Sequence, residues 1–161
     1  MHKLNNIWCL WYHSTNDNDW SINGYKKITE IDSIEKFWET YQYITPNLIQ
    51  NGMFFLMKKD ILPIWEDKQN KDGGCWSFKI IKKDIYNSWM ELSIHLLGCN
   101  ILNNSDNTND ITGISVSPKR SFCIIKIWNR DSSKSNNNLL STKIPYLYIC
   151  DSIYKSHQSK N

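Results

Sequence analysis

Hydrophobic residues recur along the chain with two different periods, one typical of helices and one of strands. The first helical pattern follows Asp32 and Glu35, which have the spacing of a capping box, and should end before Thr45-Pro46. Its apolar residues recur at i, i+3, i+4 and i+7 and are Ile34, Phe37, Trp38 and Tyr41. We therefore expect an amphipathic helix here.

A second helix is expected from about residue 84 to residue 97, with Gly98 as its C-cap. Its main apolar face consists of Ile85, Trp89, Leu92 and Leu96. Met90 and Ile94 fall on a flanking strip, which we expect to stay partly exposed.

Seven further runs have the character of strands: 7–12, 26–29, 53–58, 75–81, 113–117, 122–128 and 147–150. Two of them alternate with period two, through Trp76, Phe78 and Ile80 and through Phe122, Ile124, Lys126 and Trp128. Polar loops are expected at 103–110 and 131–138. Strands joined as hairpins, with helices packed on one side, predict an α+β fold.

Composition narrows the class of protein. With 161 residues and 40% hydrophobic content, the chain is expected to form a single domain over 1–161, with little or no N-terminal extension. The sequence has no apolar run of about 20 residues and no signal-peptide pattern, so we expect a protein without a membrane partner in the cytoplasm, with the nucleus open as a further location. The net charge of +3 is too small for a general polyanion-binding surface.

Candidate catalytic and metal-binding motifs are absent from the sequence. The five cysteines form no CxxC pair, and the four histidines have no metal-ligand spacing, which favours reduced thiols and no metal site. There is no phosphate-binding glycine loop, no HExxH and no GxSxG motif. We therefore expect a protein that is not an enzyme and needs no cofactor.

The eight tryptophans carry most of the functional information. Trp20 follows a polar, turn-forming run, and Trp65 stands between Pro63 and the acidic pair Glu66-Asp67, so both should lie in surface loops. Four others lie within strand or helix patterns and are expected in the core: Trp8, Trp11, Trp76 and Trp89. For Trp38, the sequence favours neither a place in the core nor a place at an interface over the other.

An exposed indole next to a carboxylate suits a flat ring that donates hydrogen bonds. The Glu66 carboxylate can accept two hydrogen bonds from the N1–H and N2–H₂ edge of guanine, which adenine does not offer. A guanine methylated at N7 is cationic, so two indoles around it add cation–π attraction to stacking worth about 1–3 kcal/mol per base. Lys119-Arg120 could supply cations for an attached phosphate chain, although a basic pair in a loop is usually only solvated.

Together these residues resemble the family of eukaryotic translation initiation factor 4E, which binds the cap of messenger RNA. The matching segments include Asn6 to Trp11, Phe37-Trp38, Pro63 to Asp67, Asn70 to Trp76, Leu97-Gly98, Ile127-Trp128 and Ser156-His157. All eight tryptophans fall in order at tryptophan positions of the family, and the similarity spans nearly the whole chain.

The resemblance implies a curved antiparallel sheet with helices on its convex face and the 7-methylguanosine cap on its concave face. Trp20 and Trp65 would sandwich the base, Glu66 would bind its N1 and N2 edge, the main-chain N–H of Trp65 would reach O6, and Trp128 would pack near the methyl group. Lys119, with Arg120, lies where the family has phosphate contacts.

The resemblance also implies a second site, for a protein partner. A scaffold factor of the 4G type, or a competing protein, would dock a short helix on Ile34, Trp38, Met90, Glu91, Ile94 and Gly98. The chain itself would be a monomer.

The sequence also departs from the family pattern. Cys75, Ser121 and Ile124 stand where the family has basic side chains, so fewer cations should face the triphosphate. His2-Lys3 replaces the usual His-Pro beside the partner patch. The segment 129–146 is short and rich in Asn and Ser where the family has a third helix, and the sequence stops at Asn161, soon after His157, which leaves little of a loop that approaches the second nucleotide.

The main hypothesis is therefore a cap-binding factor that recruits a scaffold to initiate translation, and three alternatives remain. A family member that binds the cap without recruiting the scaffold would repress translation; such relatives often replace the tryptophans matched by Trp8 and Trp20, both of which are kept here. An aromatic-platform carbohydrate-binding module would also expose tryptophans, but is commonly secreted. A cap-modifying enzyme would need a nucleophile or a metal site.

Overall fold

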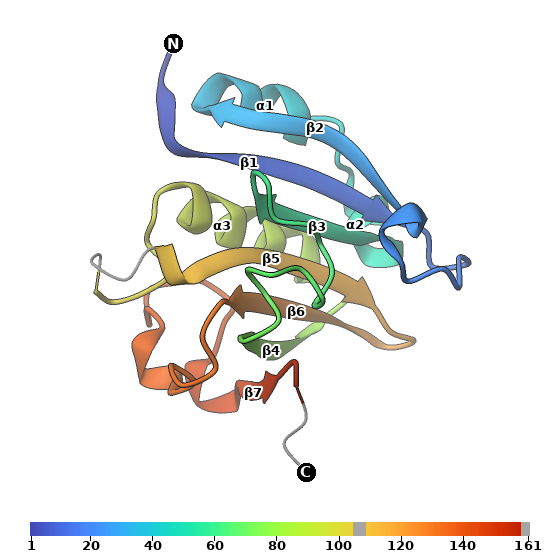
Figure 1. Cartoon of the computed structure of the whole chain (residues 1–161). Coiled ribbons are helices and arrows are strands. Elements are labelled where there is room, and N and C mark those ends of the chain that lie inside the picture. The colour runs from blue at the N-terminus through green and yellow to red at the C-terminus, as the bar shows by residue number, and fades with distance from the viewer. Residues whose placement is uncertain (105–108, 159–161) are drawn as a thin grey trace.

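The computed structural model describes residues 1–104 and 109–158, which contain one seven-stranded sheet. The strands are β1 (Lys3–His13), β2 (Tyr25–Ser33), β3 (Met53–Lys58), β4 (Gly74–Ile81), β5 (Ile111–Pro118), β6 (Phe122–Asn129) and β7 (Ile153–Ser156). All paired strands are antiparallel, in the order β2-β1-β3-β5-β6-β4-β7, which Figure 1 shows from top to bottom.

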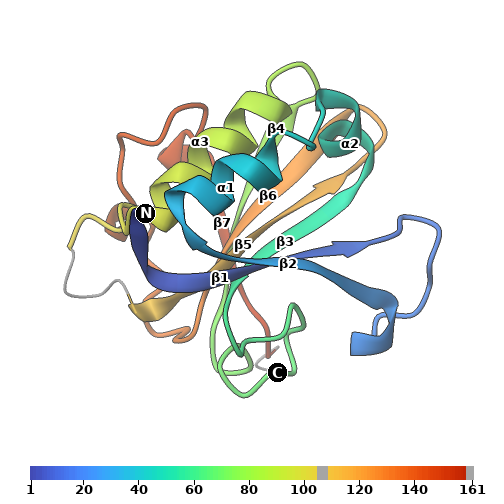
Figure 2. The same cartoon turned by 90° about the horizontal axis from the view of Figure 1, so that it is seen from above.

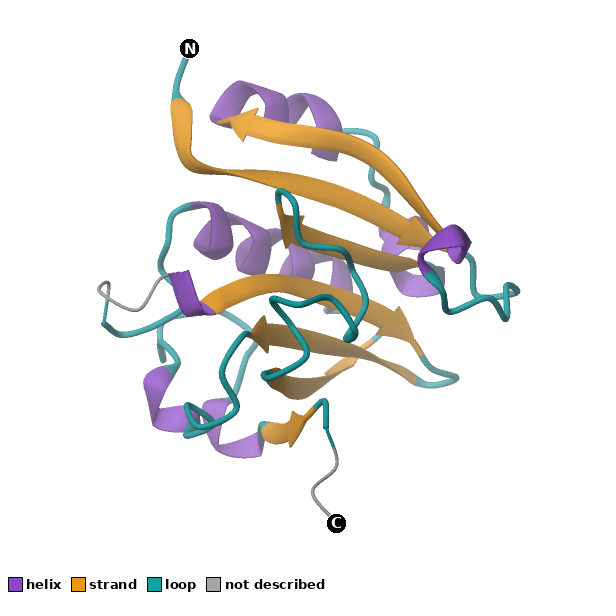
Figure 3. Cartoon of the chain, viewed as in Figure 1, coloured by secondary structure: helices purple, strands orange, loops and turns teal. Residues whose placement is uncertain are grey.

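The α-helices of the described residues cover one face of this curved sheet. They are α1 (Ile34–Tyr41), α2 (Pro46–Asn51) and α3 (Ile85–Leu97), and Figures 2 and 3 show them on the convex side, opposite the long loop that follows β3. Short 3-10 helices are η1 (Ile22–Gly24), η3 (Asn137–Leu139) and η4 (Ile149–Asp151). The predicted α+β fold, with one curved antiparallel sheet and helices on its convex face, is confirmed.

Period-two alternation assigns the side chains of each strand to two faces. Trp76, Phe78 and Ile80 of β4 face the helices and belong to the main core, at 1%, 3% and 6% exposure. The intervening positions face the concave side, where Cys75 joins a smaller apolar cluster that includes Trp128. The concave face of the sheet is therefore partly apolar as well, which makes it a surface suited to a flat ligand.

The first helix begins differently from the prediction. The side chain that caps its N-terminus is Ser33, which accepts a hydrogen bond from the backbone N–H of Lys36 at 3.1 Å. Asp32 still belongs to β2, where its carboxylate pairs with Lys3 across the strand pair at 2.9 Å. The predicted capping box of Asp32 and Glu35 is therefore wrong, because strand pairing extends one residue further than the helical pattern suggests.

The predicted apolar face of α1 divides into two rows. Phe37 and Tyr41 are buried, whereas Ile34 and Trp38 are 45% and 50% exposed. The members of each row are four residues apart, so each row follows one ridge of the helix, and only one ridge reaches the core. The second helix agrees more closely with its prediction, because Ile85, Trp89, Leu92 and Leu96 are all buried and Ile94 is 41% exposed.

Two elements were not predicted correctly. The predicted strand 147–150 is wrong, since residues 147–148 belong to no helix or strand and residues 149–150 begin η4; the seventh strand follows at Ile153–Ser156. The short helix α2 was missed, although Thr45 caps it and Pro46 occupies its first turn. In the segment 129–146, which the structure describes throughout, the helical element present is η3, so the third helix of the family is reduced to a single short turn.

The end of β6 is fixed by Asn129, a buried side chain with all its hydrogen-bonding groups used. Its Oδ1 accepts from the N–H of Gly74 at 3.1 Å and from the hydroxyl of Tyr154 at 2.7 Å. Its Nδ2 donates to the carbonyl oxygens of Asp131 and Lys134, both at 3.0 Å. Asn129 thus joins β4, β6 and β7, and so fixes the position of the concave-face residues that β7 contributes.

Candidate functional site

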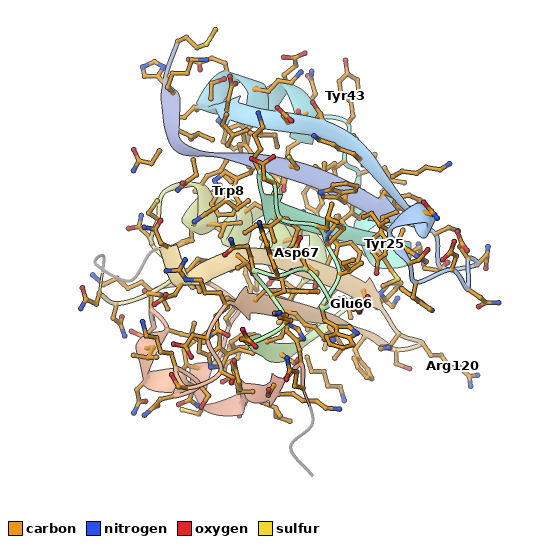
Figure 4. The ribbon with its side chains drawn as sticks, viewed as in Figure 1. Trp8, Tyr25, Tyr43, Glu66, Asp67 and Arg120 are labelled. Carbon is orange, nitrogen blue, oxygen red and sulfur yellow. The ribbon has the colours of Figure 1, made fainter. Side chains whose placement is uncertain are left out.

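A cavity opens on the concave face of the sheet. Its volume is about 440 Å³, and it is lined from several elements at once, including Trp20 before β2, Tyr25 of β2, Trp65 and Glu66 of the loop after β3, and Trp128 of β6. Figure 4 shows the labelled side chains of Tyr25 and Glu66 close to each other on this side. The structure therefore brings together four of the six predicted cap-binding residues: Trp20, Trp65, Glu66 and Trp128.

Aromatic rings form a continuous row along one wall of this cavity. The ring of Tyr25 meets the ring of Phe55 edge-on with centroids 5.2 Å apart, and Phe55 meets Trp128 edge-on at 6.4 Å. Trp20 stands at the outer end of the row, 6.5 Å from Tyr25. Edge-to-face pairs of this kind restrict the rotation of each ring. The cavity thus has a stiff aromatic wall.

Two indoles in the cavity are strongly exposed. Trp20 is 51% and Trp65 48% exposed, as expected for the two tryptophans predicted in loops. Trp128 is only 7% exposed, and its Nε1–H donates to the hydroxyl of Ser115 at 3.0 Å. Trp20 and Trp65 therefore have ring faces available to a ligand, whereas Trp128 contributes a fixed edge to the floor.

The loop that carries Trp65 and Glu66 is held by the two polar side chains that follow. The carboxylate of Asp67 accepts from the backbone N–H groups of Leu62 at 3.0 Å and Gln69 at 2.8 Å. The fully buried Asn70 donates from Nδ2 to the carbonyl oxygens of Leu62 and Ile64, at 3.1 and 2.9 Å. These bonds close the loop on both sides of Trp65, so its indole is held before any ligand arrives.

Glu66 makes no hydrogen bond or ion pair within the described part of the chain, and its side chain is exposed in the cavity. Its charge reaches Tyr25, whose pKa is raised to about 12 by burial and by the Glu66 carboxylate. The Tyr25 hydroxyl is therefore neutral at physiological pH. The carboxylate of Glu66 remains free to accept hydrogen bonds from a ligand.

The cations of the cavity are not the ones predicted. Lys126 of β6 and Lys155 of β7 line it, whereas Lys119 and Arg120 lie at the tip of the β5–β6 hairpin and are absent from the lining. Figure 4 shows Arg120 extending away from Glu66 and Tyr25. The signal for Lys126 was present in the sequence, because it alternates with Trp128 on one strand face.

Cys75 and His157 meet at one end of the cavity, with Sγ and Nε2 3.9 Å apart. Burial raises the pKa of the Cys75 thiol to about 12, while burial and the charge of Lys126 lower the pKa of His157 to about 4. Both groups are therefore neutral at physiological pH, the reverse of an activated thiolate–imidazolium pair. Among the described residues, no cluster of three or more His, Cys, Asp or Glu side chains is arranged to hold a metal ion.

The six predicted partner-binding residues lie on the opposite, convex face. Ile34 and Trp38 belong to α1; Met90, Glu91 and Ile94 belong to α3, and Gly98 follows it. Figure 2 shows α1 and α3 side by side on this face, and the buried hydroxyls of Tyr41 and Ser93 join the two helices at 2.9 Å. We call the surface formed by these six residues the convex patch.

Fold and cavity together define a class: a single-sheet protein with helices on its convex face and, on its concave face, a pocket lined by two exposed indoles and a carboxylate. The chain matches the family model of eukaryotic initiation factor 4E over residues 3–160. It belongs to the eukaryotic initiation factor 4E family.

Individual relatives agree with this assignment. Eukaryotic translation initiation factor 4E1 of Drosophila melanogaster is 33% identical over 137 residues, which are 82% of this chain and 51% of that protein, so the chain spans about half the length of this relative. Ascaris suum eIF4E-3, solved with an m2,2,7G cap, is 26% identical, with a TM-score of 0.82 over 99% of this chain and 93% of that one. C. elegans eIF4E-3, solved with the 4E-binding protein Mextli and a cap analog, is 25% identical, with a TM-score of 0.82 over 97% and 92%. No helix of the described residues is long and apolar enough to cross a membrane.

Proposed function

We propose that this chain binds the 7-methylguanosine cap of messenger RNA in the concave cavity. The observation that carries the proposal is the presence of two half-exposed indoles, Trp20 and Trp65, beside the unpaired Glu66 carboxylate in one cavity of about 440 Å³. Such a cavity suits a flat, cationic base that donates hydrogen bonds. The Ascaris suum relative was solved with an m2,2,7G cap, whose N7-methylated base is flat and cationic.

Each cavity residue has a role in this proposal. Trp20 and Trp65 stack on the two faces of the base, and Glu66 accepts from its N1–H and N2–H₂ groups. The backbone N–H of Trp65 donates to O6, and Trp128 packs near the methyl group. Lys126 and Lys155 contact the phosphate chain, a role that sequence reasoning gave to Lys119 and Arg120.

We further propose that the chain acts in the cytoplasm and initiates translation by recruiting a scaffold of the 4G type through the convex patch. Support comes from the exposed apolar side chains of Ile34, Trp38 and Ile94, which suit the apolar face of a short helix. The alternative is a family member that binds the cap without recruiting the scaffold and so represses translation.

Titration with 7-methyl-GTP and with GTP, followed by tryptophan fluorescence, tests the cap-binding proposal. We expect 7-methyl-GTP to quench the emission with a Kd at least about tenfold below that of GTP, because a desolvated cation between indoles gains about 1–2 kcal/mol. Equal affinity for both nucleotides, or quenching by an oligosaccharide in place of either, would overturn the proposal.

The assignment of the phosphate contacts gives a second prediction. Lys126→Met should weaken 7-methyl-GTP by about tenfold and leave the phosphate-free nucleoside 7-methylguanosine nearly unaffected, because the lost contact is to the phosphates. Arg120→Met is the matched control and should change neither affinity by more than about twofold. A larger loss of 7-methyl-GTP affinity with Arg120→Met than with Lys126→Met would show that the phosphates bind at the tip of the β5–β6 hairpin.

A further inference from the structure

His13, the last residue of β1, is fully buried and lies flat against the indole of Trp20. The two ring centroids are 4.1 Å apart and the ring planes are nearly parallel, at 4°. One face of the Trp20 indole is therefore covered by the protein itself. Because Trp20 lines the cavity and is 51% exposed, its other face is the one available to a base.

Both ring nitrogens of His13 face backbone carbonyl oxygens. Nδ1 lies 2.8 Å from the oxygen of Ser14, and Nε2 lies 2.8 Å from the oxygen of Asp19. A carbonyl oxygen can only accept, and a neutral imidazole has one N–H, so only the imidazolium can donate to both oxygens. In the neutral ring, one nitrogen lone pair would oppose a carbonyl lone pair, and that contact would open.

The two carbonyl groups mark the beginning and the end of the loop that leads into Trp20. The Asp19 carbonyl fits against Nε2 only because residue 24 is a glycine; a Cβ there would lie 1.9 Å from that oxygen and 3.0 Å from Nε2. The imidazole therefore ties both ends of the 14–19 loop to the end of β1. It also supports the indole from behind.

Three residues from neighbouring elements surround the His13 ring. Hydrogen bonds from Ser21 hold the pKa of the Asp19 carboxyl below its usual value, so this neighbour is an anion. Tyr25, on β2, meets the imidazole edge-on at 4.7 Å and is neutral, with its pKa raised to about 12. On β3, the residue paired with His13 is the uncharged Met53.

We propose that His13 is a positioning residue for the cap site: as an imidazolium it holds the 14–19 loop by both ends and fixes the free face of Trp20 toward the base. The inference rests on the proposed cap-binding function. It predicts that cap affinity depends on pH through one ring proton of His13, a residue that the ligand does not contact. It also predicts that part of the preference for the methylated base is kept when His13 is changed, because Trp65 and Glu66 are unaltered.

The test is the Kd of 7-methyl-GTP and of GTP between about pH 5 and 8, measured for the wild type, His13→Phe and His95→Gln. Phenylalanine keeps a flat ring against Trp20 and removes both donors. His95 is the matched control, since its Nδ1 also lies 2.8 Å from a backbone oxygen, that of Glu91, but on α3.

At the acid end we expect His13→Phe to bind 7-methyl-GTP about tenfold more weakly than the wild type. This difference should shrink as the pH rises, because the wild type then loses its second donor. 7-methyl-GTP should still bind more tightly than GTP, and His95→Gln should follow the wild type throughout. Identical pH profiles for the wild type and His13→Phe would overturn the inference.

A second measurement needs no variant and no cap. Nitrogen NMR of the histidine rings in the wild type should show both nitrogens of His13 protonated at the acid end of the range, with the Trp20 emission changing as one proton is lost. A single neutral tautomer throughout would overturn the inference. Equal binding of 7-methyl-GTP and GTP by the wild type would instead contradict the proposed function, while the NMR result still decides the role of His13.

Discussion

Glu66→Gln should lower the affinity for 7-methyl-GTP by about 100-fold or more. Two hydrogen bonds to a charged acceptor contribute about 1.5–3 kcal/mol each, and a loss of about 2.7 kcal/mol is already a factor of about 100. Glutamine has nearly the same shape, but its amide replaces one acceptor oxygen with an NH₂ donor, so only one of the N1–H and N2–H₂ groups of the base keeps an acceptor, and that acceptor is uncharged. Binding titrations followed by tryptophan fluorescence measure the loss directly.

The fold should tolerate this change. Glu66 is exposed and has no hydrogen bond or ion pair within the described residues, so the thermal midpoint should stay close to that of the wild type. Glu39→Gln is the matched control, because Glu39 is an exposed carboxylate on α1, 3.5 Å from Lys36 and on the opposite face of the sheet. An affinity of Glu66→Gln within about threefold of the wild type would contradict the role of this carboxylate.

Helices and strands were predicted most accurately where a single hydrophobic pattern extends over a long segment. The strand predicted at 53–58 has the observed bounds, and the second helix begins one residue later than predicted. In both segments apolar residues repeat without interruption, so burial and local propensity favour the same structure. Trp20 and Trp65 were correctly predicted to be exposed, because a tryptophan within a polar, turn-forming segment is not positioned to pack in the core.

Predictions failed where a local pattern competed with pairing across the sheet. Residues 147–150 are more apolar than Ile153–Ser156, yet the latter pair with β4, and Tyr146 before the wrong segment has a positive φ of 70°. The edge strand β7 alternates between exposed and half-buried side chains, so it has no apolar signal. Misplacing this strand concealed Lys155, which the register places opposite Cys75 of the cavity.

Trp11 illustrates why spacing within a strand matters. It was expected in the core with Trp8, but the two residues are three positions apart, so their side chains point to opposite faces of β1. Trp8 is 2% exposed and belongs to the main core, whereas Trp11 is only partly buried and packs against the concave cluster of Phe55 and Trp128. Such a residue supports the aromatic wall of the cavity from the side of β1.

The role of His13 had no sequence signal of its own. A single histidine at the end of an apolar strand is usually a satisfied core residue, and neither period nor spacing indicates a stacked indole seven residues later. The contact arises because the 14–19 loop folds back, bringing the Asp19 carbonyl to His13 and Trp20 over its ring. Long-range geometry of this kind is set by the tertiary fold and by the close approach that Gly24 permits.

Trp38→Ala should abolish binding of a short helical peptide taken from a 4E-binding protein, with a loss of about 30- to 1000-fold. A central aromatic anchor of an interface typically contributes about 2–4 kcal/mol. Trp38 is 50% exposed on α1, one turn after Ile34, and the hydrogen bond between Tyr41 and Ser93 fixes α1 against α3, so the helix that carries Trp38 is in place before the peptide binds. Fluorescence anisotropy of a labelled peptide measures the effect.

Trp20→Ala is a closely matched control, because Trp20 is the same residue type with almost the same exposure, 51%, on the opposite face. It should lose 7-methyl-GTP and keep the peptide, whereas Trp38→Ala should lose the peptide and keep 7-methyl-GTP. Unchanged peptide affinity in Trp38→Ala would move the docking site away from the convex patch. A wild type that binds 7-methyl-GTP but no scaffold-type peptide would favour the repressing alternative. In that case the concave face would bind the cap while the convex patch would not recruit a scaffold.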